Sequence, residues 1–300
     1  MRLKTTLDQW QTLYEIERAG SIQAAATVLN KSHTTLIYAV KKLEEQLGVS
    51  LITVEKRRAV LTEDGKSLLR RANTMLEQAR ELEEISKQLS KGIESEIVVA
   101  MDHLCNPDWL YSPMAEYLSE NSTTSIQVVE TSLSKTSHMV TSEEADIAII
   151  TLPVTNYPAE AFGVTTMLPV IAADHPLAQK ASVCVSEFSI IPQIVVRDLG
   201  DESRKVSKQD VGWLKSRQRI TVDNFDHALR AVEKGVGFCR LPEHVIKKRA
   251  DSGLVVLNVE NAKRYQVPLH LTLPKGSKTG PAAKGFYDRL LKYSEDRKKE

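Results

Sequence analysis

Apolar residues recur at helical spacing in three consecutive segments near the start of the chain. Thr6 and Gln9 stand at capping-box spacing before the first segment. Gly20 and Ser21 can end that helix and cap the second, and Ser32 can cap the third. The apolar faces are Leu7, Trp10, Leu13, Tyr14 and Ile16, then Ala24, Ala25, Val28 and Leu29, then Leu36, Val40, Leu43 and Leu47. This pattern predicts three short helices joined by tight turns.

The third helix carries polar side chains opposite its apolar face. Hydroxyl groups and cations are mixed there, which suits contact with base edges and phosphates. Two helices joined by a tight turn, the second amphipathic and cationic, form the helix-turn-helix pattern, whose second helix lies in the major groove of DNA. We therefore expect DNA contacts from Ser32, His33, Thr34, Thr35, Tyr38, Lys41 and Lys42.

The segment 51–61 has extended character around three consecutive cations, Lys56, Arg57 and Arg58. Because this cluster directly follows the recognition helix, we interpret the segment as a two-stranded wing that presents cations to the DNA backbone. The alternative is a solvated turn. On the first interpretation, Arg57 and Arg58 contact phosphates.

A long stretch without proline or glycine, residues 66–91, follows the capping residue Thr62. It predicts a helix of roughly 25 residues, about 40 Å long. Its apolar positions alternate spacings of three and four, as in a helix that pairs with a second helix. These positions are Leu68, Ala72, Met75, Ala79, Leu82, Ile85 and Leu89. We predict a dimer contact through this stripe, in which all but Ile85 take part; the alternative is a helix packed along its own domain.

Beyond Gly92 the pattern changes to short apolar runs separated by helical segments. Strands are predicted at residues 97–101, 126–130 and 146–151, with a helix after Pro107 and another at 133–142. The almost wholly apolar third run is typical of a strand buried on both faces of a parallel sheet. This part of the chain is therefore predicted to be an α/β domain.

The composition is that of an ordinary globular protein. Its residues are 42% hydrophobic and 26% charged. A chain of 300 residues is long enough for two or three hydrophobic cores. No apolar run approaches the roughly 18 residues of a membrane helix, and the first residues lack the apolar stretch of a secretory signal. We therefore expect a cytoplasmic protein without membrane contact. Although the net charge is only +1, residues 1–71 hold 12 Lys and Arg against 8 Asp and Glu, as a nucleic-acid-binding module would.

Two motifs carry a family resemblance. The chain has the pattern Gly-Ser-x-x-x-Ala-Ala beginning at Gly20, and the pattern Leu-Thr-x-x-Gly ending at Gly65. Between them the segment resembles the winged helix-turn-helix of LysR-type transcriptional regulators. The order of the later segments is similar to that family over essentially the whole chain.

The resemblance implies an architecture and a set of partners. It places an all-α winged helix-turn-helix domain at 1–62, a linker helix that pairs two subunits at 63–91, and a two-lobed, periplasmic-binding-protein-like effector domain at 92–300. Lobe I would comprise 92–163 and 267–300, and lobe II 164–266. The implied partners are double-stranded DNA, a small-molecule effector and further copies of the chain, as a dimer or a tetramer, with RNA polymerase as a further candidate. No cofactor or metal is implied.

The chain departs from the family pattern at three positions. The family usually has a small hydroxyl residue where Ile37 stands, and Phe and Arg where Ile52 and Val54 stand. An isoleucine can touch a thymine methyl group but cannot donate a hydrogen bond, and losing a cation removes about one phosphate contact per subunit. We therefore expect weaker sequence discrimination than is usual in the family.

A cleft between the two lobes is the predicted effector site, because ligands of open parallel sheets bind beyond the carboxyl ends of the strands. That rule selects Met101, Asp102, His103, Thr151, Arg197, Asn224 and Arg240. The inducer pocket of the family resembles this set most at Met101, Asp102, Thr151 and Arg197. The two arginines favour an anionic effector, whereas Asp102 favours a cationic or hydroxylated one, and the sequence leaves both open.

The sequence favours a ligand-gated regulator over the other classes of function. An enzyme is disfavoured because the seven histidines are scattered and the sequence has neither a nucleophile elbow nor a phosphate-binding glycine loop. A DNA-binding protein without a switch is disfavoured because a sensor domain of about 200 residues exceeds what dimerisation requires. Gating by oxidation of Cys105 is a further alternative, although no cationic neighbour or partner cysteine stands beside it in the sequence.

Overall fold

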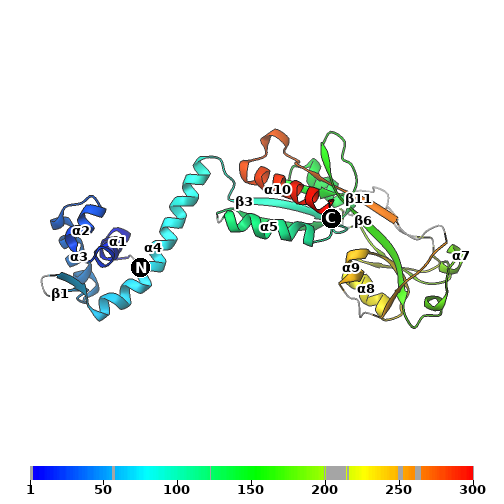
Figure 1. The fold of residues 1–300 in the computed structure, drawn as a ribbon, viewed down its shortest axis with the longest axis horizontal. Helices are drawn as coiled ribbons and strands as arrows, with labels where there is room; N and C mark the ends of the chain where they lie inside the picture. Colours follow the sequence, from blue (N-terminus) through cyan, green and yellow to red (C-terminus); the bar gives the residue numbers. More distant parts are fainter. Residues whose placement is uncertain are drawn as a thin grey trace. The chain divides into compact units, whose positions relative to one another are not determined.

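The computed structural model describes residues 3–55, 58–121, 123–198, 200, 214, 216–248, 253–260 and 265–299. The chain divides after Lys91 into two compact units. Figure 1 shows the first unit, which is mostly helical, in blue to cyan, and the second, which is built around a sheet, in cyan to red. None of the helices in the described stretches is both long and apolar enough to cross a membrane.

The first unit contains the three predicted short helices, a hairpin and a long helix. Its elements are α1 (Leu7–Ala19), α2 (Ile22–Val28), α3 (His33–Leu47), β1 (Ile52–Glu55), β2 (Arg58–Leu61) and α4 (Glu63–Ser90). Ser21 and Ser32 each accept the backbone N–H of the residue three positions on, as helix caps do. Gly48 ends α3 in the left-handed conformation, with φ of 73°.

Gly65, which closes the second motif, occupies a position where no side chain fits. A Cβ atom there would collide with the carbonyl oxygen of Leu51, just before β1. Leu51 is fully buried, as is Leu43 on α3, and both lie in the core of this unit together with Leu69 of α4. The glycine therefore lets α4 begin directly against the start of the hairpin, which explains why the motif ends on this residue type.

The second unit contains, within the described stretches, one sheet of nine strands and the helices that cover it. Its elements are β3 (Glu96–Asp102), α5 (Asp108–Glu120), β4 (Ser125–Thr131), α6 (Leu133–Thr141), β5 (Ile147–Ile150), β6 (Ala159–Ala172), the 3₁₀ helix η1 (Pro176–Gln179), α7 (Val185–Phe188), β7 (Gln193–Val196), β8 (Arg219–Val222), α8 (Phe225–Glu233), β9 (Phe238–Pro242), α9 (Glu243–Lys247), β10 (Leu254–Val256), β11 (Tyr265–Thr272), the 3₁₀ helix η2 (Gly276–Lys278) and α10 (Pro281–Arg297). The strand order is β4-β3-β5-β11-β6-β9-β7-β8, with β10 beside β6.

Two parallel groups of strands lie on either side of the antiparallel pair β6–β11. β3 is parallel to β4 and β5, and β7 is parallel to β8 and β9. β6 is long enough to pair with β11 along its first part and with β9 and β10 along its second. Lobe I is thus built on β3, β4 and β5, and lobe II on β7, β8 and β9. This confirms the predicted two-lobed α/β fold.

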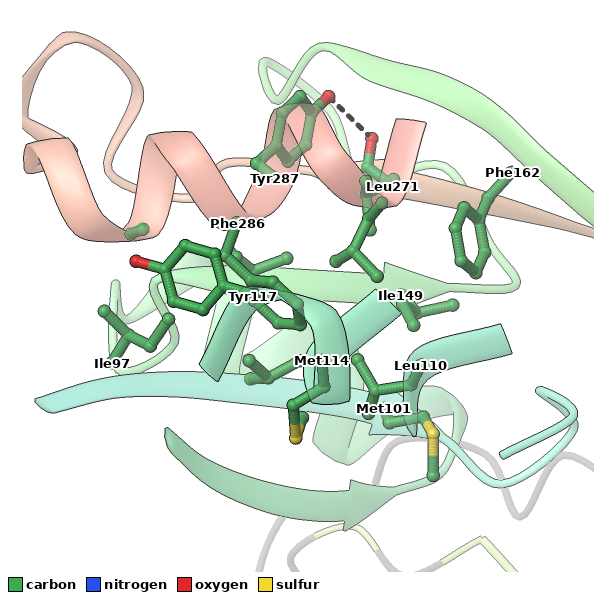
Figure 2. Close-up of a cluster of buried hydrophobic side chains, with 14 of the residues drawn as sticks. Ile97, Met101, Leu110, Met114, Tyr117, Ile149, Phe162, Leu271, Phe286 and Tyr287 are labelled. Carbon is green, nitrogen blue, oxygen red and sulfur yellow. Dashed lines mark hydrogen bonds between the residues drawn. The ribbon is translucent and has the colours of Figure 1, made fainter. Parts of the chain in front are cut away.

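The core of lobe I lies between the sheet and helices α5 and α10 (Figure 2). Its fully buried members include Ile97, Leu110, Ile149, Phe162, Leu271 and Phe286. The hydroxyl of Tyr287 on α10 donates a hydrogen bond of 3.4 Å to the carbonyl oxygen of Leu271 on β11. Packing and this bond fix α10, near the end of the chain, onto the sheet that begins the unit.

Candidate functional site

Helix α3 has one buried face and one exposed face. Leu36, Val40 and Leu43 are buried, and the exposed residues include all seven predicted contacts, Ser32, His33, Thr34, Thr35, Tyr38, Lys41 and Lys42. The ammonium nitrogen of Lys42 lies 5.9 Å from the ring centroid of Tyr38. Hydroxyls, an aromatic ring and two cations therefore share one accessible surface, which can reach base edges and phosphates.

The hairpin β1–β2 has the position and pairing of the predicted wing. The carboxylate of Glu44 on α3 accepts the N–H groups of Leu51 (2.7 Å) and Ile52 (3.1 Å), so the wing is joined to the recognition helix by charge-assisted hydrogen bonds. Of the two predicted phosphate contacts, Arg57 lies outside the described residues. Arg58 is described by its backbone pairing alone.

Two of the family departures differ in their surroundings. Ile37 is partly buried, while its neighbour Tyr38 is 67% exposed. Val54 on β1 is 74% exposed. A side chain at position 54 can therefore reach solvent or DNA without disturbing the core, whereas a change at 37 also alters packing.

The apolar residues of α4 lie on two different surfaces. Leu69, Ala72 and Leu76 are buried in the core of the first unit. Met75, Leu82 and Leu89 are 39%, 68% and 51% exposed. Ala72, which was predicted at the dimer contact, is thus 6% exposed because it packs within its own unit. The exposed members of the stripe continue beyond it along the helix.

A cavity of about 410 Å³ lies between the lobes of the second unit. Lobe I supplies residues after β3 and β5 and at the start of α6, and lobe II supplies residues of β7, α8 and β9. Four of the seven predicted effector residues line it: His103, Thr151, Arg197 and Arg240. Its volume is typical of sites for small molecules.

Two predicted residues are placed elsewhere by their local structure. Met101 is 5% exposed and belongs to the core of lobe I, where it packs beneath α5 (Figure 2). Asn224 caps α8, and its side-chain oxygen accepts the N–H of His227 at 2.9 Å. Neither lines the cavity. The pleat of β3 turns the side chain of Met101 into the core, and the side chain of Asn224 is engaged in capping α8.

Asp102 is also absent from the cavity lining, although it lies next to His103. Its side chain is fully buried, and the carboxylate accepts the N–H groups of Leu104 (3.0 Å) and Leu133 (3.2 Å) and the hydroxyl of Thr151 (3.1 Å). Burial raises the pKa of this carboxyl group. Asp102 therefore joins the end of β3, the start of α6 and the end of β5 below the cavity.

Arg197 lines the cavity but already has a partner. Its Nε lies 2.5 Å from Oδ1 of Asp223, the residue that follows β8. The neighbouring strands β7 and β8 are parallel, so their carboxyl ends bring the two side chains together. The positive charge of Arg197 is therefore balanced within lobe II.

His103 and Arg240 present buried nitrogen atoms that lack a hydrogen-bond partner among the described residues: Nδ1 of His103 and Nε of Arg240. The imidazole ring packs against Phe225, with ring centroids 4.9 Å apart. Burial lowers the pKa of both residues. Buried polar groups normally have partners, so both lining residues keep unused hydrogen-bonding capacity.

Asp198 is a lining residue that the sequence did not single out. It follows β7 in lobe II, yet its carboxylate accepts the hydroxyl of Ser132 (3.1 Å) and the N–H of Ser134 (3.2 Å) at the start of α6 in lobe I. This contact joins the two lobes beside the cavity. Ser132 follows β4, so the strand-end rule could have found it, but the pairing with Asp198 is not visible in the sequence.

Much of the remaining lining is apolar and was also missed. Leu104, Met167 and Val267 form a buried cluster, with Phe225 packed against it. Met167 comes from within β6, which passes the cavity, and Val267 lies near the amino end of β11, which begins at the cavity with Tyr265. A rule based on the carboxyl ends of strands cannot select such residues.

Two of the three cysteines lie in the protein interior. Cys105 and Cys239 are buried, and burial raises the pKa of each thiol to about 12. A thiol with so high a pKa stays protonated and reacts slowly with oxidants. Among the described residues no cluster of His, Cys, Asp and Glu could hold a metal ion.

Comparisons with known proteins bear on both units. Over residues 90–295 the sequence matches the family model described as LysR substrate binding domain. Over residues 7–66 it matches the model described as bacterial regulatory helix-turn-helix protein, lysR family. Together the two matches span nearly all of the chain.

The chain also matches individual relatives over most of its length and of theirs. The chain is 28% identical over 260 residues to the uncharacterized HTH-type transcriptional regulator YeeY of Escherichia coli K12, covering 85% of this chain and 83% of that one. It is 24% identical over 297 residues to the RuBisCO operon transcriptional regulator of Allochromatium vinosum, covering 96% of each. Among solved structures, the full-length LTTR LysG from Corynebacterium glutamicum with bound effector Arg is similar, with a TM-score of 0.51 and 18% identity over 97% of this chain and 98% of that one. That likeness shows a shared fold.

Proposed function

This chain belongs to the LysR family of bacterial transcriptional regulators, and from that premise we propose that a small molecule bound between the lobes controls how its helix-turn-helix acts on operator DNA. The observation that carries the proposal is the cavity of about 410 Å³, whose walls come from both lobes. An occupant that touches both lobes binds one arrangement of them more tightly than another. It therefore shifts the population between arrangements, which is the physical requirement for a switch.

In this proposal each part of the chain has a role. The domains are those expected from the sequence: 1–62 binds DNA, 63–91 pairs subunits, and 92–300 binds the effector. The exposed face of α3 reads base edges through Thr35 and Tyr38, while Lys41 and Lys42 neutralise phosphates. The protein acts in the cytoplasm, where the DNA is, and RNA polymerase is a candidate further partner.

The exposed part of α4 supports pairing of two subunits. Met75, Leu82 and Leu89 repeat every seven residues and remain accessible within the first unit. A seven-residue apolar repeat on a long helix is buried when two such helices pair. The proposed assembly is a dimer through α4, which can associate further into the tetramer that the family resemblance implies.

The test uses the full-length protein and operator sites selected from a random duplex library. Binding to the selected sites is measured with and without a metabolite extract, and we expect the extract to change operator affinity. Leu152→Trp, at a partly exposed lining residue, should block this response. Val164→Trp, at a similarly exposed residue of β6 outside the cavity lining, is the matched control. A response that survives Leu152→Trp as fully as Val164→Trp would place the effector elsewhere.

A further inference from the structure

We infer that the effector is an organic monoanion with an apolar body, whose acidic group pairs with Arg240 and whose second polar group meets His103. The inference rests on the proposed function and goes beyond it by naming the chemical class of the ligand. It also decides between the anionic and the cationic or hydroxylated effectors that the sequence left open.

Most of the charged groups around the cavity are balanced within the protein. Arg197 is paired with Asp223. The carboxylate of Asp198 is engaged at the N-terminus of α6, where the hydroxyl of Ser132 donates to it and the helix dipole favours a negative charge. These three charged groups are satisfied within the protein, so they do not call for an ion from outside.

Arg240 is the exception among the charged residues of the lining. It lies in the middle of β9, its Nε is buried, and no carboxylate pairs with it among the described residues. The phenol of Tyr265 is the titratable group that acts on it electrostatically. A guanidinium keeps its charge at neutral pH, and a partly buried charge without a counterion is unfavourable. A carboxylate or another acidic group of the ligand would supply the missing partner. The guanidinium of Arg240 could then donate two parallel hydrogen bonds to the two oxygens of that group.

The body of the ligand would meet apolar side chains. The cluster of Leu104, Met167 and Val267, with Phe225 beside it, gives the cavity an apolar wall. A second charge on the ligand would be desolvated against that wall without a partner, since Asp198 is already engaged. The ring of His103 is held by Phe225, and burial lowers its pKa, so it is neutral and can exchange one hydrogen bond with a hydroxyl, carbonyl or acid group.

The experiment uses a bacterial metabolite extract separated by ion exchange into acidic, basic and neutral fractions. The melting temperature of the full-length wild-type protein is measured with each fraction, and the compound that binds is identified by mass spectrometry. We expect the acidic fraction alone to raise the melting temperature. If only the basic or the neutral fraction does so, the inference fails while the proposed function stands. If no fraction stabilises the protein, both fail.

Variants at two arginines of lobe II test whether Arg240 binds the acidic group of the ligand. Arg240→Met should weaken binding of the acidic compound by about ten- to a hundredfold, the range expected for losing a charge-assisted hydrogen bond, and Arg240→Lys should weaken it less. Arg230→Met is the matched control, because Arg230 is a paired arginine of the same lobe, on α8 and outside the cavity lining, and this variant should change affinity by less than about threefold. Melting without ligand reports whether each variant folds, and Arg240→Gln serves if the methionine variant does not. Unchanged affinity in a folded, uncharged variant at 240 would overturn the assignment.

Discussion

The exposed face of α3 and the cavity between the lobes are both binding surfaces, but the sequence specifies them in different ways. The first draws its residues from positions 32–42 of a single helix, whose buried and exposed faces follow from helical periodicity alone. The second draws on residues from 103 to 268, contributed by both lobes and by the strands between them. A surface made by one element can be predicted residue by residue, whereas an assembled cavity cannot.

The difference extends to charge. Lys41 and Lys42 are exposed on α3, as the pattern indicates. At the cavity, by contrast, the meaning of each charged residue depends on a distant partner. Arg197 is balanced by Asp223, and the carboxylate of Asp102 accepts hydrogen bonds within lobe I. Arg240 has no carboxylate partner among the described residues. Electrostatic character at such a site follows from the tertiary structure rather than from residue type.

The largest expected effect tests whether the apolar stripe of α4 pairs two subunits. In Leu82→Asp a carboxylate replaces an exposed leucine on α4, and pairing of two helices would bury it without a counterion. The dissociation constant of the dimer should rise by at least about a hundredfold. Sedimentation velocity across a concentration series measures the change. Lys87→Asp also places a carboxylate on α4, but five residues from Leu82 and therefore about 140° round the helix from it, where the side chain is exposed, and it should leave the dimer intact; equal behaviour of the two variants would contradict pairing through this face.

The next effect tests whether Asp102 supports the cavity from below. Asp102→Ala leaves the N–H groups of Leu104 and Leu133 and the hydroxyl of Thr151 without their acceptor. The free energy of unfolding should fall by about 3 kcal/mol. Denaturant titration measures it. Asp223→Ala removes an exposed carboxylate and should lower the same quantity by less than about 1 kcal/mol; a similar loss in both variants would show that Asp102 has no special structural role.

The sequence predicted the family and the fold, but only part of the cavity. Its two motifs led to a family that is confirmed, and its periodicities led to a fold that is confirmed. Within the cavity, the strand-end rule found His103, which follows β3, but it also selected Met101, whose side chain the pleat turns into the core. Arg240 was selected by the same rule and does line the cavity, although the structure places it within β9 rather than at a strand end. The rule missed Met167 because β6 passes the cavity in mid-strand. Positions were predictable where one element decides them, and not where a neighbouring strand or loop does.

A smaller effect separates two kinds of contact on α3. Lys42→Ala should weaken binding to all duplexes alike and reduce the dependence of affinity on salt by about one unit of slope for each phosphate that is no longer neutralised. Tyr38→Ala should instead change which bases are preferred, by about tenfold at one position of the site. Selection from a random duplex library, followed by titration at several salt concentrations, measures both. If both variants change only the salt dependence, Tyr38 contacts the backbone rather than a base.

The smallest expected effect concerns the wing, where the chain departs from its family. Val54 is 74% exposed on β1, so an arginine there meets no steric obstacle. One added cation per subunit should form one further phosphate contact, because affinity for DNA follows local positive charge. Val54→Arg should therefore raise operator affinity by less than about tenfold and steepen the salt dependence by about one unit per subunit, while the preferred sequence stays the same. Val54→Gln, similar in reach but uncharged, is the matched control and should leave the slope unchanged. An unaltered slope in Val54→Arg would mean that position 54 does not face phosphate, and that the resemblance of the wing to its family does not extend to how this strand meets DNA.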